Sequence, residues 1–248
     1  SKTEPGSEQR YVAYNWDIQK YGEPVRAGSS QSILRRLGSD RQLVMFTSGQ
    51  GTVGDINIFR YEGEIAVPCG GTRDGGKNLW IDINGDGRED AGESAVMDSP
   101  VGWVTTMCVD SKGDLWAGVP ATNGSFMRHF FFKGINEKGV TLYSAVKGDG
   151  YEDVRFPDEG DKTNAWGMAC RLDYDAERDI MVVFYPAVPR TGEGDKSTPQ
   201  YFFGRYDGWS KGNRTAKWKH KALRPETEPE YFMYETDLFP YSGYMGMQ

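Results

Sequence analysis

Short runs of alternating apolar and polar residues recur along the chain, and glycine or aspartate stands where most runs break. Residues 32–46 alternate on both sides of a break at 38–40, and residues 55–67 do so around a break at 62–63. A period of two is that of a strand with one buried face, and two such runs around a tight break predict a hairpin. The two hairpins predict a first four-stranded antiparallel unit over about 32–67.

The same plan returns twice further along the chain, in a second unit over about 103–143 and a third over about 166–220. Residues 11–16 predict an additional lead strand. We therefore expect 1–248 to be a single all-β domain built from repeated antiparallel units. The hairpins predicted for the later units are 105–117 and 127–143 in the second, and 168–185 and 201–220 in the third.

The tightest of these turns reads Val-Asp-Ser-Lys-Gly-Asp-Leu-Trp at residues 109–116. With its alternating flanks it resembles a blade of a β-propeller of the NHL or two-component-sensor type, and the resemblance covers about 33–220. Asp110, Gly113, Asp114 and Trp116 carry it, whereas the first and third units keep the turn without the tryptophan. In that family the tryptophan packs between neighbouring sheets, which the resemblance implies for Trp116.

A β-propeller closes its ring with about four to eight blades, so three units are too few on their own. We expect the chain to be an arc, a segment of a larger propeller whose open end is covered by further propeller segments or subunits. Alternatively, the lead strand and the aromatic residues 231–248 contribute to a fourth unit. A β-sandwich with long loops is the structural alternative.

Residues 82–93, Asp-Ile-Asn-Gly-Asp-Gly-Arg-Glu-Asp-Ala-Gly-Glu, match the pattern of an EF-hand calcium loop position by position. Gly87 stands sixth, where the loop must turn sharply to surround a cation that takes about six to eight oxygens. The tryptophan strand together with this loop also resembles large secreted bacterial propeller proteins. The alternative is an acidic surface turn that binds no ion. The predicted Ca²⁺ ligands are Asp82, Asn84, Asp86, Arg88 through its backbone carbonyl, Asp90 and Glu93.

The chain of 248 residues carries a net charge of −7. Nucleic acid and anionic membranes favour clustered Lys and Arg, and the one basic run, 211–221, is short and broken, so neither partner is expected. No apolar run approaches the roughly 20 residues of a membrane-spanning helix. Weak calcium sites made only of oxygen fill where calcium is abundant, so the loop favours a secreted or cell-surface protein.

Three cysteines, Cys69, Cys108 and Cys170, are too few and odd in number for a disulfide framework. We expect them to be small buried apolar side chains, although a Cys108–Cys170 bond stays open.

Conventional catalytic motifs are absent, since the sequence has only two histidines and neither a Gly-x-Ser-x-Gly nor a His-Glu-x-x-His motif. Alternation gives His129 a ladder or packing role. A glycoside hydrolase or lyase needs only two placed acids, which the long acidic loop at 149–161 could supply. A solvated loop or a second weak calcium site are the alternatives for it. Its acids are Asp149, Glu152, Asp153, Asp158, Glu159 and Asp161.

Tryptophans near strand ends offer flat rings that suit the face of a sugar or a peptide side chain, although they also fill gaps between sheets. The candidates are Trp80, Trp103, Trp166, Trp209 and Trp218. The sequence thus predicts a secreted, calcium-stabilised β-propeller that acts as a binding or scaffold module for a glycan or protein ligand, rather than an enzyme. A carbohydrate-active enzyme and a subunit of an extracellular assembly are the alternatives.

Overall fold

The computed structural model describes residues 31–48, 55–63, 65–102, 104, 106–119, 126–155, 171–187 and 200–221. These residues form an all-β fold of three antiparallel sheets, and none of them lies in an α-helix. The predicted fold class is therefore correct at this level. The lead strand at 11–16 and the aromatic residues 231–248 lie outside the described residues.

The first sheet has the order β1-β2-β3-β4-β5-β6. It contains both predicted hairpins, β1–β2 and β3–β4, and continues through two strands beyond residue 67 that the alternation did not predict. The missed strands are short, and β6 is exposed throughout, so neither shows an alternating pattern. The strands are β1 (Gln31–Leu37), β2 (Gln42–Ser48), β3 (Ile56–Glu62), β4 (Ile65–Arg73), β5 (Asn78–Ile81) and β6 (Ser94–Val96).

The second sheet has the order β10-β9-β8-β7, with β7 (Thr106–Val109), β8 (Leu115–Val119), β9 (Phe126–Phe130) and β10 (Tyr151–Arg155). The predicted hairpin around residue 111 is present as β7–β8. The predicted return strand within 127–143 is wrong, because β9 pairs instead with β10. Residues 131–150 lie outside the named strands and hold the isolated bridge Ile135–Thr141.

The third sheet has the order β11-β12-β13-β14, with β11 (Arg171–Asp175), β12 (Ile180–Ala187), β13 (Gln200–Asp207) and β14 (Trp218–Lys221). Both hairpins predicted for this unit are present. A short 3-10 helix, η4 (Trp209–Lys211), follows the turn at Gly208, where φ is +75°. A glycine suits this turn because a left-handed backbone is costly for other residues.

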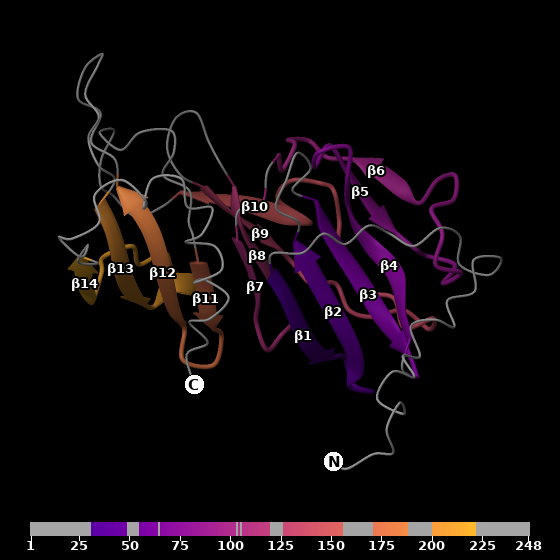
Figure 1. Cartoon of the computed structure of the whole chain (residues 1–248), viewed down its shortest axis with the longest axis horizontal. Helices are drawn as coiled ribbons and strands as arrows, with labels where there is room; N and C mark the ends of the chain where they lie inside the picture. Colours follow the sequence, from indigo (N-terminus) through magenta and orange to yellow (C-terminus); the bar gives the residue numbers. More distant parts are fainter. Residues whose placement is uncertain are drawn as a thin grey trace, which may run out of the picture.

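The three sheets lie side by side with the second in the middle (Figure 1). Met107, Val109 and Leu115 pack with residues of the first sheet, whereas Cys108 and Trp116 pack with residues of the third. The period of two thus gives the second sheet two buried faces. The first strands of the sheets meet, since β7 contacts β1 on one side and β11 on the other.

Side chains of β1 cover the free edge of β7. The Gln31 amide donates to the Met107 carbonyl (Nε2 to O, 2.7 Å) and accepts from the Met107 N–H (3.0 Å). Arg35 Nε donates to the Val109 carbonyl at 2.7 Å. These contacts satisfy backbone groups that an edge strand would otherwise leave unpaired, and they join the first two sheets.

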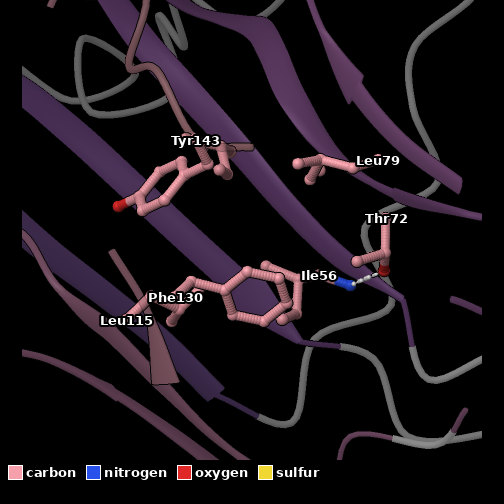
Figure 2. A pocket seen from close by; sticks show the side chains of 8 residues that line it. Ile56, Thr72, Leu79, Leu115, Phe130 and Tyr143 are labelled. Carbon is pink, nitrogen blue, oxygen red and sulfur yellow. Dashed lines mark hydrogen bonds between the residues drawn. The ribbon is translucent and has the colours of Figure 1, made fainter. Parts of the chain in front are cut away.

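A small apolar void lies between the first and second sheets (Figure 2). It encloses about 10 Å³, and a water molecule there would lack the polar partners that buried waters need. It is therefore a packing defect, too small for a ligand. The residues around it are Ile56, Ile58, Gly71, Thr72, Leu79, Leu115, Phe130 and Tyr143.

Cys69 and Cys108 are buried free thiols, as expected of small apolar side chains, and Cys170 lies outside the described residues. Burial raises the pKa of the Cys69 thiol to about 12. A neutral thiol of this kind is neither a nucleophile nor a metal ligand.

Candidate calcium loop and polar clusters

The predicted calcium loop connects β5 to β6 inside the first sheet. It therefore lies within the first sheet and is not the connection from the first sheet to the second. It nevertheless contacts the second unit, because Asn136 Nδ2 donates to the Ile83 carbonyl at 3.0 Å. Gly85 also lies against Lys138, whose Cβ would be 2.6 Å from a Cβ added at that glycine. The loop thus joins β5 to β6 and packs against residues 136–138.

Asp82, the first predicted ligand, is fully buried. Its Oδ1 accepts the N–H groups of Gly85 and Asp86, both at 3.0 Å, and its Oδ2 accepts the Gly87 N–H at 3.0 Å. Gly87 adopts φ +83°, which turns its N–H back towards the aspartate. The buried carboxylate therefore organises the first half of the loop.

Arg60 of β3 provides the buried positive charge beside this carboxylate. Its side chain is 4% exposed and donates to Asp82 Oδ2 at 3.1 Å and to the Gly85 carbonyl at 2.8 Å. It also pairs with Glu62 at 2.5 Å. A buried charge needs such a partner because removal from water is costly. The sequence spacing gave no sign of Arg60, which lies 22 residues before Asp82.

Burial raises the pKa of the Asp82 carboxyl above its ordinary value of 3.8. The Gly87 N–H and the positive charge of Arg60 act in the opposite direction, and the nearby acids Glu93 and Asp86 add to the increase. Burial and negative neighbours therefore outweigh the stabilising contacts of the ionised form.

The other predicted ligands accept hydrogen bonds from the loop itself. Asn84 Oδ1 accepts the Asp86 N–H at 2.9 Å, and Asp86 Oδ1 accepts the Arg88 N–H at 2.9 Å. Glu93 accepts the N–H groups of Asn84 (3.2 Å) and Asp90 (3.1 Å). The first and last parts of the loop are thereby linked.

The donors fit a calcium ion by their chemistry, since they are oxygens of carboxylates, an amide and a carbonyl in the spacing that calcium loops use. In this structure the same oxygens serve the N–H groups of the loop. Across the described ranges there is no cluster of three or more His, Cys, Asp or Glu side chains arranged to hold a metal.

The five candidate tryptophans divide into two that are buried, two that lie outside the described residues, and Trp218, which is 37% exposed. Trp80 and Trp209 are 1% and 0% exposed, so burial leaves neither ring face free for a ligand. Trp80 instead donates from Nε1 to Glu93 Oε2 at 3.3 Å and lies under Arg73, while Arg214 lies over the Trp209 ring. Trp103 and Trp166 lie outside the described residues.

The acidic stretch 149–161 is not a continuous loop, because Glu152 and Asp153 belong to β10. As neighbours on a strand they point to opposite faces. Asp153 pairs with Arg128 at 2.7 Å and Lys147 at 3.2 Å, and Asp149 pairs with Lys133 at 3.0 Å. Asp149 and Asp153 thus pair with different basic side chains. Asp158, Glu159 and Asp161 lie outside the described residues.

A cluster around His129 lies where the second and third sheets meet. The imidazole stacks on Trp116 with ring centroids 3.6 Å apart, and its two nitrogens contact Asp114 Oδ2 (2.9 Å) and Glu152 Oε1 (3.1 Å). The side chain is 13% exposed. These contacts agree with the predicted packing role of His129. The pairing with Glu152 depends on the register of β9 and β10, which alternation alone did not reveal.

Trp116 also extends from the second sheet to the third, with ring centroids 5.2 Å from Tyr174 and 6.3 Å from Trp209. It therefore packs between neighbouring sheets, as the sequence resemblance implied.

No helix among the described residues has the length and apolar character needed to cross a bilayer. A scan of protein-family models found none that matches the chain, and a search of curated proteins likewise found no match.

Proposed function

We propose that this chain is a calcium-binding, all-β recognition or scaffold module of a secreted or cell-surface protein. The observation that carries the proposal is the twelve-residue loop, whose donors have calcium spacing and whose first aspartate is buried in a hydrogen-bonded turn. A bound Ca²⁺ would offset the mutual repulsion of Asp82, Asp86, Asp90 and Glu93. Occupancy would therefore stabilise the β5–β6 hairpin and its contact with residues 136–138.

We further propose that the three sheets are blades of a propeller arc. Two observations support this arrangement over a two-layer sandwich. The first strand of the middle sheet, β7, contacts the first strands of both other sheets, and the middle sheet is buried on both faces. Radially arranged blades have this contact pattern, whereas a β-sandwich buries only the inner face of each of its two sheets.

Calcium binding is tested by measuring the melting temperature and Tb³⁺ luminescence of the purified chain after treatment with EGTA. Added calcium should raise the melting temperature, because a ligand at 100 times its Kd stabilises the fold by about 2.7 kcal/mol. Bound Tb³⁺ should be sensitised by Trp80, which donates a hydrogen bond to Glu93. Calcium should then displace the Tb³⁺ signal.

The matched variants are Glu93→Gln, at the last ligand position, and Glu89→Gln, at a loop position that supplies no predicted ligand. Glu93→Gln should abolish both responses, whereas Glu89→Gln should keep them. A wild-type melting temperature that does not change with calcium would overturn the calcium proposal.

The enzyme alternative has no comparable support among the described residues. Glu152 and Asp153 point to opposite faces of β10, so they do not form the facing pair of carboxylates that glycoside hydrolysis requires. The binding role is therefore the function that the observations favour.

A further inference from the structure

The face of the third sheet that points away from the second carries aromatic and basic side chains. Tyr206 packs with the second sheet, so alternation directs Phe203 and Arg205 to the opposite face. Directly paired residues share a face, which adds Trp218 opposite Arg205 and His220 opposite Phe203. We call the four residues Phe203, Arg205, Trp218 and His220 the Trp218 face.

The Trp218 face presents exposed rings on an edge strand. Trp218 is 37% exposed, and its ring centroid lies 5.2 Å from that of His220, with planes tilted by 37°. On the same face, Phe203 stacks on Phe184 with ring centroids 4.5 Å apart. Exposed flat rings of this kind suit the apolar faces of sugar rings.

The charge of this region is opposite to that of the whole chain. The segment from Gln200 to Lys221 has six Lys and Arg residues and one Asp, in a protein of net charge −7. The local excess of positive charge favours an anionic partner. The six basic residues are Arg205, Lys211, Arg214, Lys217, Lys219 and Lys221. Arg205 belongs to the Trp218 face and Lys217 contacts the adjacent Asp207, whereas Arg214 lies over the Trp209 ring and alternation directs Lys219 away from the face.

The single aspartate shows how this region holds a carboxylate. Arg205 Nε donates to Asp207 Oδ1 at 2.6 Å, and Lys217 Nζ donates to Asp207 Oδ2 at 2.9 Å. These hydrogen bonds, from Arg205 first and then Lys217, lower the pKa of Asp207 below 3.8. One carboxylate is therefore shared by two cations, so the group keeps an excess positive charge next to Trp218.

We propose that the Trp218 face binds an acidic polysaccharide, with Trp218 and His220 against sugar rings and Arg205 and Lys217 facing carboxylates of uronic acids. This inference rests on the proposed binding function and names its ligand class. An acidic peptide fits less well, because a peptide added as a strand at the β14 edge would leave the side chains of the face without contact. A sugar chain lying across the face contacts both rings and cations.

Binding is measured by isothermal titration calorimetry of the wild-type chain with polygalacturonate at 50 mM NaCl, with neutral dextran and polyglutamate as comparison polymers. Polygalacturonate should bind and dextran should not. Trp218→Ala should weaken binding about tenfold or more, the loss typical of a central aromatic anchor. Raising NaCl to 500 mM should also weaken binding, since salt screens exposed charges. Lys77→Ala, at an exposed lysine of the first sheet, should bind as the wild type does.

Three outcomes would overturn the inference. They are no binding of polygalacturonate, equally tight binding of polyglutamate with no effect of Trp218→Ala, and self-association of the chain that Trp218→Ala abolishes in light scattering. The calcium response of Trp218→Ala is measured on the same sample. A retained calcium shift without polysaccharide binding would reject this inference alone, whereas loss of the shift in the wild type rejects the proposed calcium site.

Discussion

Gly71 of β4 lies where there is no room for a side chain against the backbone of β3. Its φ is +140°, and a Cβ added there would lie 2.1 Å from the carbonyl oxygen of Ile56. The strand pairing is irregular nearby, with a register shift between Ile58 and Phe59. A side chain at Gly71 would therefore push the two strands apart.

Gly71→Ala should lower the free energy of unfolding by about 3 kcal/mol or more, because backbone atoms rather than a flexible side chain occupy the space. Gly63→Ala is the control, since Gly63 has φ +62° and no atom within 4 Å of an added Cβ. It should cost only about 1 kcal/mol for the backbone conformation. Urea unfolding followed by circular dichroism gives both values, and equal losses would contradict the close approach.

Asp153 gives the fold a stabilising contact that depends on pH. Burial raises its pKa, but the hydrogen bonds and charges of Arg128, which is 3% exposed, and of Lys147 together outweigh burial and hold the pKa below 3.8. A lowered pKa in the folded state means that the contribution is complete above the pKa of the unfolded chain. It is then lost as pH falls through the folded value.

Asp153→Asn should therefore destabilise the chain by about 1–2 kcal/mol at pH 7, where it removes a charge-assisted hydrogen bond. The difference in unfolding free energy between wild type and variant should shrink below pH 4 and approach zero at still lower pH. Urea titrations at several pH values measure it. A difference that stays constant with pH would show that the charge of Asp153 does not stabilise the fold.

Trp116 joins the second sheet to the third through its ring faces and edges, while its Nε1 is buried without a hydrogen-bond partner. The ring contacts of Trp116 therefore stabilise the fold, whereas burial of its unpaired N–H group destabilises it. Trp116→Ala should lower the unfolding free energy by about 3–5 kcal/mol. Trp116→Phe should cost only about 1–2 kcal/mol, because it keeps a ring and removes the unpaired donor.

Trp218→Ala is the matched control for these variants, since that ring is on the exposed edge strand β14. It should change stability by less than about 0.5 kcal/mol. Thermal and urea unfolding would test the series, and equal costs for Trp116→Phe and Trp116→Ala would refute the ring contact as the source of stability.

Apolar strands that flank a tight turn could be predicted from sequence, which is why β1, β2, β7, β8, β11 and β12 are found at the expected hairpins. β6 shows no apolar pattern because all of its residues are exposed. β10 was hidden by its acids, which pair across the sheet with Arg128 and His129 rather than with solvent alone. Local pattern cannot reveal partners that lie far away in sequence.

The candidate calcium loop could be predicted as a series of oxygen donors because its predicted ligands are all local. Its buried partner Arg60 and its contact Asn136 could not, since both come from elsewhere in the chain and depend on how the sheets pack. The same limit explains the tryptophans. Trp80 and Trp209 lie near strand ends or turns just as Trp218 does, but only the packing of the sheets decides which ring is exposed.

The three sheets are arranged by their first strands, β1, β7 and β11, and by two apolar clusters on either side of the middle sheet. This arrangement makes the middle sheet the structural centre of the described chain. The candidate calcium loop lies in the first sheet and the Trp218 face on the third, so the two proposed sites occupy different sheets. Loss of one can therefore be measured without loss of the other.

The side chain of Gln31 acts towards β7 as a peptide group of a neighbouring strand would, by offering one donor and one acceptor to Met107. An uncovered edge is a template on which further chains can add and aggregate. Gln31 and Arg35 together occupy backbone groups of β7 that an added strand would need for pairing. The contact between the first two sheets therefore also protects this edge from edge-to-edge pairing while the sheets stay together.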